Sequence, residues 1–295
     1  MLPPFEYHQP QTLAEALELM AALPEPKKAL AGGTDVIPAM RKGELTTGHL
    51  VALGRLAELR QIQIQNPEVR IGPLVTFSEL AKSPLVNRCC KLLAEAAASV
   101  GGPQIRNQGT IGGNIVNASP AGDLLPPLVA LEARVELCRQ GGERTLPLAE
   151  FLVGRGKTLL SAGEILTGIS FPPLPAGAAS SFVKLGRRNS LAISRLSVAV
   201  IVILDRKGRV AGARLALGAV APKPVRVPAA EVLLCGNYPG PELLEEVVGA
   251  VANTVKDVLG SRPSAPYKQV AVRSVAREAL LKAMPAFGQK GGRAQ

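Results

Sequence analysis

Two glycine pairs have the residue types and spacing that best suit binding chemistry. They lie in the segments AGGTD, at residues 31–35, and TIGGN, at residues 110–114. Glycine has no Cβ, so backbone N–H groups at such a pair can approach an anionic oxygen, and neighbouring Thr and Asn side chains add donors. Two such turns facing one extended ligand would hold a diphosphate without lysines. The alternative is that each pair is only a tight turn.

Other phosphate-binding patterns do not fit these segments. No G-x-G-x-x-G occurs in either place, which excludes a Rossmann fingerprint, and no G-K-[ST] follows, which excludes a P-loop.

Residues that commonly ligate metals are few. The chain has four cysteines and two histidines, which are Cys89, Cys90, Cys138, Cys235, His8 and His49. The cysteine spacing matches neither a C-x-x-C site nor an iron-sulfur cluster, and we interpret these residues as buried apolar thiols in a reducing compartment. Two isolated imidazoles cannot supply a metal site or a histidine-based triad. We therefore predict no metal ligands in this chain.

The formal net charge is +11, which raises the question of nucleic-acid binding. Basic residues are scattered, aromatic residues make up only 3% of the chain and Trp is absent, so little is available to stack on bases. An acidic partner subunit or an anionic ligand explains the charge equally well. No apolar run reaches the roughly 18 residues of a membrane span, and the N-terminus lacks a signal-peptide pattern, so we expect a cytoplasmic protein.

Capping boxes and apolar periodicity predict helices. The two boxes are Thr12 with Glu15, and Thr76 with Glu79. The first begins a helix over about 12–23, and a further helix is expected over residues 85–98, stopped by the glycines at 101–102.

Alternating segments predict strands around these helices. HLVAL is a strand, QIQIQNPEVRIG is a hairpin about Asn66-Pro67, and residues 133–147 form a second hairpin about Gly141-Gly142. EILTGISF is a strand that ends at a proline pair, and LPAGAASS resembles a linker. We place a domain boundary near residue 177.

The remainder predicts a sheet with helices on one side. Two long apolar strands surround the turn Asp205–Gly208, and two amphipathic helices follow, separated by residues 260–263. The last residues, GQKGGRAQ, are expected to be a frayed tail.

Several blocks together resemble a known family. ALAGGTDVIPAMRKG, QIRNQGTIGGNIVNASPAGDLLPPLVAL, EILTGISFP, SFVKLGRRNSLAISRLSVAV and ALGAVAPKPVRV occur in the order found in the FAD-binding medium subunit of the xanthine dehydrogenase and carbon monoxide dehydrogenase family of molybdenum hydroxylases. The resemblance spans nearly the whole chain. It implies an α+β fold, with a two-subdomain PCMH-type FAD-binding domain at 1–176 (subdomains about 1–55 and 56–176), a smaller C-terminal domain of antiparallel sheet and helices at 177–285, and a flexible tail at 286–295.

The resemblance also implies a set of FAD contacts, carried over position by position. The first segment is Ala29, Leu30, Ala31, Gly32, Gly33, Thr34, Asp35 and Val36. The second is Thr110, Ile111, Gly112, Gly113, Asn114, Val116, Asn117 and Ser119, and further contacts are the carboxylate of Asp123, the apolar Leu166 and the lysine Lys184.

Some of these residues have other interpretations. Asp123 could instead cap the turn before Pro126, and Lys184 could be a solvated charge at a strand end. Arg187 and Arg188 suit either a partner interface or a phosphate. Thr34-Asp35 differs from the His-Ser of the carbon monoxide dehydrogenase branch, so that substrate is not inferred.

The implied function is electron transfer through non-covalent FAD. Partner subunits would supply the rest: a molybdopterin-binding large subunit and a small subunit with [2Fe-2S] clusters. No residue of this chain need act as a catalytic acid, base or nucleophile. The substrate of the holoenzyme, its stoichiometry and its final acceptor, whether NAD, quinone, oxygen or ferredoxin, are left open by the sequence.

Three rival functions differ in the chemistry that they require. Covalent flavoprotein oxidases need a His or Cys beside the glycine turn, and neither occurs there. A stand-alone FAD-dependent oxidoreductase needs a proton donor, for which only Ser190 or Ser194 is a candidate. A basic nucleic-acid-binding module is the third.

Overall fold

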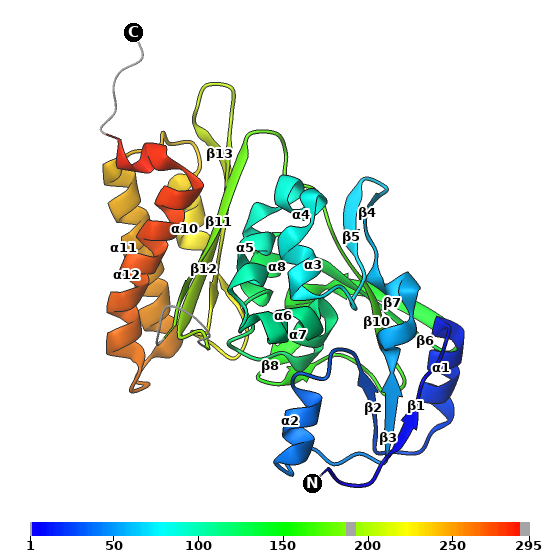
Figure 1. The fold of residues 1–295 in the computed structure, drawn as a ribbon. Coiled ribbons are helices and arrows are strands. Elements are labelled where there is room, and N and C mark those ends of the chain that lie inside the picture. Colours follow the sequence, from blue (N-terminus) through cyan, green and yellow to red (C-terminus); the bar gives the residue numbers. More distant parts are fainter. Residues whose placement is uncertain (1, 187–192, 290–295) are drawn as a thin grey trace.

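The N-terminal part of the chain begins with a small parallel sheet. The computed structural model describes residues 2–186 and 193–289 (Figure 1). The strands pair in the order β1-β3-β2 and are β1 (Glu6–His8), β2 (Lys27–Leu30) and β3 (His49–Ala52). Between them lie α1 (Leu13–Ala22), which packs against β3, and α2 (Val36–Arg41), which follows the first glycine pair.

The helix expected over 12–23 is confirmed, but its capping box is only half formed. The Thr12 hydroxyl accepts the N–H of Glu15. The Glu15 carboxylate accepts the N–H of Gln11 at 2.7 Å, so it does not return to the Thr12 N–H that a reciprocal box requires.

A five-stranded antiparallel sheet follows. Its order is β4-β5-β10-β6-β7, with β4 (Ile62–Gln65), β5 (Glu68–Ile71), β10 (Ile165–Phe171), β6 (Arg134–Arg139) and β7 (Gly142–Pro147). Both expected hairpins are confirmed, and Asn66 adopts the positive φ of 53° that the first turn needs. Shorter elements connect the sheets: η1 (Leu53–Arg55), η2 (Ala57–Arg60), α9 (Leu148–Phe151), β8 (Leu152–Gly154) and β9 (Lys157–Thr158).

Six short helices lie between the second and third sheets. They are α3 (Phe77–Lys82), α4 (Pro84–Cys89), α5 (Lys91–Ser99), α6 (Pro103–Gln108), α7 (Ile111–Asn117) and α8 (Leu125–Ala130). The Thr76–Glu79 capping box is complete. The single helix expected over 85–98 is wrong, because Cys90 leaves the helical region (φ −160°, ψ 62°) where its side chain enters the core, and α4 and α5 are therefore separate.

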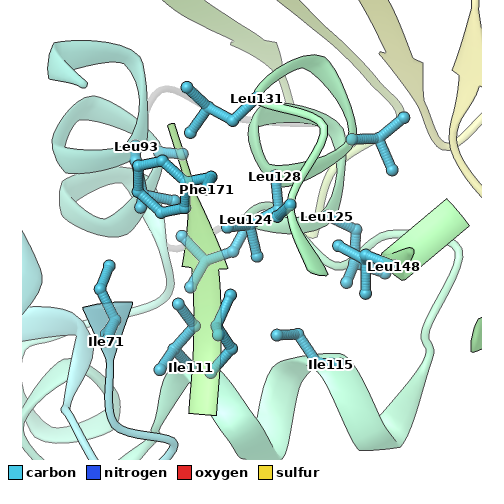
Figure 2. Packing of buried hydrophobic residues seen from close by; sticks show 14 of the residues in the cluster. Ile71, Leu93, Ile111, Ile115, Leu124, Leu125, Leu128, Leu131, Leu148 and Phe171 are labelled. Atoms are coloured by element: carbon cyan, nitrogen blue, oxygen red, sulfur yellow. The ribbon is translucent and has the colours of Figure 1, made fainter. Parts of the chain in front are cut away.

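The core of this region is apolar and buried. Figure 2 shows Phe171 of β10 beside Leu93 of α5, with Leu124 and Leu128 close to them. Because fully burying a side chain of this kind is worth about 1.5–3 kcal/mol, this cluster fixes the helices against the central strand.

The C-terminal domain holds a four-stranded antiparallel sheet and a helical layer. Its strands are β11 (Ala178–Leu185), β12 (Leu196–Leu204), β13 (Val210–Gly218) and β14 (Val225–Arg226). The expected hairpin about residues 205–208 and both long helices are confirmed; the helices are α11 (Pro241–Leu259) and α12 (Ala265–Ala283). The sequence did not reveal α10 (Pro228–Leu234), which packs on β13.

Helices cover both faces of this sheet, which corrects the expectation of one covered face. In Figure 1, α11 and α12 lie on one side, and α5 and α8 of the N-terminal part lie on the other. Phe182 and Ile201 therefore belong to the core shared with α5, whereas Val198 and Val200 face the C-terminal helices. This double burial explains the unbroken apolar run of β12.

The last described residues pack against the C-terminal domain. Residues Pro285–Gly288 form η3 and the side chain of Phe287 is fully buried, so the chain is still packed at the position where a tail was predicted. Residues 290–295 of that tail, and Arg187, Arg188 and Ser190, lie outside the described residues. Among the helices of the described ranges, none combines the length and apolar character needed to cross a bilayer.

Candidate functional site

A cavity of about 240 Å³ lies where the two glycine segments meet. Most of the predicted contact residues line it: Ala29, Ala31, Gly32, Gly33, Thr34, Asp35, Val36, Thr110, Gly112, Gly113, Asn114, Val116, Asn117 and Leu166. The volume is below the roughly 300–1,000 Å³ of pockets that enclose a drug-sized ligand. It therefore suits the central part of an extended ligand whose ends lie outside.

Five predicted residues do not line this cavity. They are Leu30, Ile111, Ser119, Asp123 and Lys184. Ile111, the first residue of α7, is fully buried in the core and points away from the cavity. The sequence also missed residues that do line it: Lys28, Leu53, Pro73, Leu74, Phe77, Gly156, Leu160, Glu164 and Ile165.

The loop at residues 31–35 presents unused backbone donors. Within the described ranges, the N–H groups of Gly32, Gly33, Thr34 and Asp35 have no protein acceptor. Gly33 has φ +71°, a conformation that turns the chain from β2 into α2 and that glycine adopts without strain. Asp35 precedes α2 without a side-chain cap, and partial burial raises the pKa of its carboxyl group. Successive free N–H groups of this kind form an anion-binding concavity.

The second glycine pair does not form a tight turn in a loop. It lies in the first helical turn of α7. Thr110 is the N-cap and accepts the N–H of Gly113 at 3.0 Å. The N–H groups of Ile111 and Gly112 donate to the carbonyls of Val75 and Pro73, at 3.0 and 2.9 Å. These donors are therefore occupied, and the expectation that TIGGN offers free N–H groups to an anion is corrected.

The three glycines that face the junction have different roles. A Cβ on Gly32 would lie 2.6 Å from the carbonyl carbon of Gln108, and one on Gly112 would lie 2.5 Å from Cβ of Pro73. Both glycines thus permit contact between protein segments. A Cβ on Gly113 would meet only the Thr110 hydroxyl, at 3.1 Å. Of the three, only Gly113 has room that a ligand can use.

One polar atom at the cavity lacks a partner. The side-chain oxygen Oδ1 of Asn114 is buried and accepts no hydrogen bond within the described part of the chain. Leaving such an acceptor unpaired costs about 1–3 kcal/mol, so a donor from a bound molecule would be stabilising there. The free donors at 32–35, the space beside Gly113 and the Asn114 acceptor together fit a dinucleotide with an anionic centre and hydrogen-bonding ends.

Comparison with known proteins identifies the family. The family model described as the FAD binding domain in molybdopterin dehydrogenase matches residues 3–174, and that of the CO dehydrogenase flavoprotein C-terminal domain matches residues 181–283. The chain is a FAD-binding subunit of the molybdenum hydroxylase family. It is an oxidoreductase subunit with the α+β fold expected from its sequence.

Known proteins match this chain over nearly its full length. The xanthine dehydrogenase FAD-binding subunit of Escherichia coli O157:H7 is 34% identical over 286 residues, covering 96% of this chain and 97% of that protein. The nicotinate dehydrogenase FAD-subunit of Eubacterium barkeri is 34% identical, covering 92% and 93%. The solved carbon monoxide dehydrogenase of Hydrogenophaga pseudoflava is similar with a TM-score of 0.88 and 33% identity, covering 97% and 99%.

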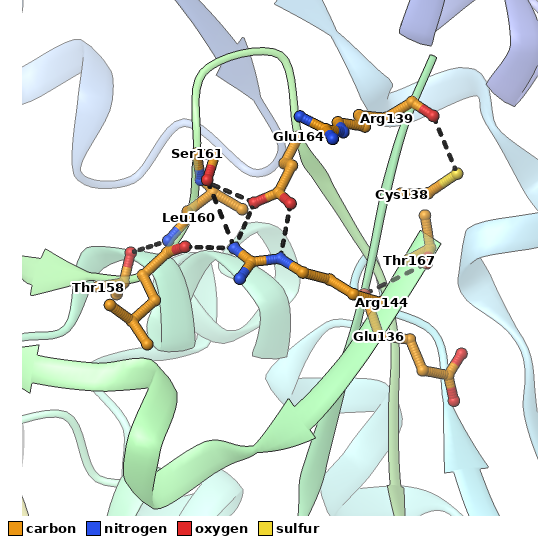
Figure 3. Close-up of polar contacts among 10 residues, drawn as sticks. Glu136, Cys138, Arg139, Arg144, Thr158, Leu160, Ser161, Glu164 and Thr167 are labelled. Atoms are coloured by element: carbon orange, nitrogen blue, oxygen red, sulfur yellow. Dashed lines mark hydrogen bonds and ion pairs between the residues drawn. The ribbon is translucent and has the colours of Figure 1, made fainter. Parts of the chain in front are cut away.

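An arginine holds one wall of the flavoprotein's cavity in place. The loop of residues 159–164, between β9 and β10, supplies the lining residues Leu160 and Glu164. Figure 3 shows Arg144 of β7 reaching this loop: its Nε and Nη2 donate to the two carboxylate oxygens of Glu164, at 2.7 and 2.8 Å, and Nη2 also donates to the Leu159 carbonyl at 2.6 Å. Glu164 in turn accepts the N–H of Ser161, which closes the loop on itself.

Replacing Arg144 with glutamine is expected to loosen this wall. Glu164 would stay buried without its paired cation, at a cost of about 1–2 kcal/mol after allowance for the partial exposure of Arg144. The dissociation constant for FAD should rise about tenfold, which fluorescence titration would measure. Unchanged affinity would show that the loop keeps its position without the arginine.

The Arg144–Glu164 pair makes the free energy of unfolding depend on pH. The Arg144 guanidinium holds the pKa of Glu164 below its ordinary value, so the native state binds this proton less tightly than the unfolded chain. The stabilisation is complete above the unfolded pKa of about 4.3 and is lost as pH falls through the lower native pKa. Urea unfolding of wild type and Arg144→Gln at several pH values should converge at the acid end.

Asp123 and Lys184 form a buried ion pair that joins the two domains. Their charged atoms are 2.5 Å apart, and the side chains are only 7% and 12% exposed. Lys184 also donates to the Ser99 carbonyl at 3.0 Å, and the Ser194 hydroxyl donates to Asp123. Burial raises the pKa of Asp123, an effect that Lys184 and Ser194 offset in part. This arrangement differs from both alternatives given above, a solvated Lys184 at a strand end and an Asp123 that caps the turn before Pro126. The Ser194 hydroxyl, the candidate proton donor, donates its hydrogen bond to Asp123.

Removing either partner should destabilise the protein more than removing both. A double-mutant cycle of Asp123→Asn and Lys184→Met, followed by urea unfolding, is expected to give a coupling energy of about 1–3 kcal/mol. FAD titration of the folded Lys184→Met variant tests the predicted flavin contact separately. Unchanged FAD affinity would remove Lys184 from the set of cofactor contacts, and additive single effects would contradict the pairing.

Proposed function

We propose that this chain holds FAD non-covalently between the 31–35 loop and the start of α7, and passes electrons between partner iron-sulfur clusters and NAD or another acceptor. The observation that carries the proposal is the convergence of free backbone donors, the open side of Gly113 and the unpaired Asn114 oxygen on one cavity. Bound FAD would supply the exchange between single electrons and electron pairs.

The residues of the chain bind and orient the cofactor in this proposal. The N–H groups of residues 32–35 hold the diphosphate, and Asn114 accepts a hydrogen bond from the dinucleotide. Leu166 and Leu160 provide apolar contact and limit the access of water. Since no step requires proton transfer to or from a side chain, the cavity needs no catalytic acid or base.

The positions of cysteine and histidine favour non-covalent attachment. All four cysteines and both histidines lie in the described ranges, and none lines the cavity. Cys90 is buried in the core, Cys235 is exposed on the C-terminal domain, and the histidines lie on β1 and β3. A covalent flavin link would need one of these side chains beside the glycine segments.

The same dispersal supports partner subunits for the remaining cofactors. Within the described residues no group of cysteines is close enough to hold a cluster. We propose a molybdopterin-binding large subunit and a [2Fe-2S] small subunit as partners. The similar carbon monoxide dehydrogenase of Hydrogenophaga pseudoflava supports this, because its solved form is described as lacking the Mo-pyranopterin moiety of a molybdenum cofactor. The four free cysteines fit a reducing, cytoplasmic setting, which we also propose.

The experiment is purification of the chain alone and with its native partners. The isolated chain should be yellow, and acid precipitation should release one FAD per chain into the supernatant. Anaerobic NADH should then bleach the flavin of the complex and reduce its clusters, if NAD is the acceptor. Colour that stays with the pellet would contradict non-covalent binding, and a colourless chain that binds RNA would contradict the proposal as a whole.

A further inference from the structure

The only two histidines of the chain are in contact, although they are 41 residues apart in sequence. The sequence indicated isolated imidazoles, but parallel pairing of β1 with β3 brings them together at the N-terminal edge of the small sheet (Figure 1). Glu6 pairs with His49 across the strands, and His8 follows Glu6 by two residues and so shares its face.

Three donor atoms of these residues face one point. Nε2 of His8 and Nδ1 of His49 are 3.2 Å apart, and Oε2 of Glu6 is 3.7 Å from the first and 3.4 Å from the second. A tetrahedral zinc ion with bonds of about 2.0–2.1 Å has ligand–ligand separations of roughly 3.3–3.4 Å. The three atoms therefore lie close to the corners of one face of a coordination tetrahedron.

No lysine or arginine of the described residues neutralises this cluster. Within those ranges, the nitrogen atoms at ion-pair distance from the Glu6 carboxylate are those of the two imidazole rings. Lys27 lies beside His49 on β2, but its ammonium group donates to the Leu23 carbonyl at 2.7 Å and pairs with Glu25 at 3.3 Å. The carboxylate and imidazoles are thus free to take a cation of their own.

The site is shielded on one side and open on the other. The side chains of His8 and His49 are 21% and 15% exposed, and that of Glu6 is 71% exposed. The imidazoles are thereby held by the sheet, whereas the carboxylate lies on the solvent side. A fourth position would be filled by water, as in zinc sites with three protein ligands.

We propose that Glu6, His8 and His49 bind one divalent transition-metal ion, of which zinc is the best fit. Imidazole donors favour zinc, cobalt, nickel or copper over magnesium or calcium. The ion joins the short edge strand β1 to β3. None of the three residues lines the flavin cavity. Its role is structural, and it is independent of FAD.

The test uses the full chain without a histidine tag, freed of metal with EDTA and titrated with Zn²⁺ and Co²⁺. Calorimetry should give one ion per chain with the same affinity in FAD-loaded and FAD-free protein. The Tm should rise by about 3–6 °C at 100-fold excess over Kd. Bound Co²⁺ should show d–d bands without a thiolate charge-transfer band, since the ligands are nitrogen and oxygen.

Variants locate the ion. His8→Asn and His49→Asn should each weaken binding about 100-fold or more, and Glu6→Gln about tenfold, and each variant should remain folded in EDTA. Cys235→Ser and Glu44→Gln are matched controls for an exposed thiol and an exposed carboxylate, and should bind as wild type. Binding that survives both histidine substitutions, or a wild-type chain whose Tm does not respond to Zn²⁺, would overturn the proposal and leave a simple imidazole–imidazole hydrogen bond.

Discussion

Gly113→Val is expected to abolish FAD retention while the protein stays folded. The added side chain would meet only the Thr110 hydroxyl on the protein side, so its methyl groups extend into the cavity. The N–H bond to Thr110 survives, and valine has a better helix propensity than glycine, which offsets the crowding. The FAD dissociation constant should rise about 100-fold or more, because the cofactor and the side chain compete for one space.

The loss of FAD is measured as flavin content after gel filtration and by fluorescence titration. Circular dichroism shows whether the variant is folded. Gly113→Ala should weaken binding less, since one methyl group fills less of the cavity. Gly249→Ala is the matched control, because Gly249 lies within α11 with open space around its Cβ position. A Gly113→Val variant that retains stoichiometric FAD at wild-type affinity would show that this glycine does not approach the cofactor.

Gly32→Ala should damage both FAD binding and the fold around it. The new Cβ would lie against the backbone carbonyl of Gln108, far inside the 3.0 Å below which Cβ contacts do not occur. Neither partner is a flexible side chain, so the 31–35 loop must move away from the segment before α7. Overpacking of this kind costs about 3 kcal/mol or more, and the two halves of the cavity separate.

Urea unfolding followed by circular dichroism is the suitable measurement, since the chain has no tryptophan. Excess FAD should not restore the stability of Gly32→Ala, whereas Gly113→Val should unfold at the same urea concentration as FAD-free wild type. Gly54→Ala is the control, because nothing lies within 4 Å of its Cβ position and its φ is not positive. Wild-type stability of Gly32→Ala would mean that the two segments are not in contact.

Local patterns predicted the elements that depend on local contacts. The Thr76–Glu79 box, the hairpin at Asn66 and the long apolar strand β12 each carry their signal within a few residues. The cavity could be predicted only from the family motifs, because no local periodicity relates the two glycine segments to each other. The break at Cys90 had no such signal; at this point the carbonyl of the preceding Cys89 accepts the N–H of Leu174, a residue distant in sequence.

The start of α7 shows where local reasoning fails. Two adjacent glycines have poor helix propensity, and TIGGN was therefore interpreted as a turn. The helix forms because tertiary contacts hold it: Thr110 bridges Thr76, and the next two N–H groups donate to the segment 73–75. The apolar lining residues such as Leu53 and Phe77 were missed for a similar reason, since in sequence they do not differ from core residues.

The doubly covered sheet of the C-terminal half has a consequence for electron transfer. Because Phe182, Ile201 and Ala216 are packed into the N-terminal core, excising residues 177–295 would strip the sheet of one covering layer and yield an aggregating fragment, not an independent module. The shared core also packs the two halves of the described chain against each other. In the proposed function, tunnelling distances from the flavin to carriers in partner subunits would then depend mainly on how whole subunits dock.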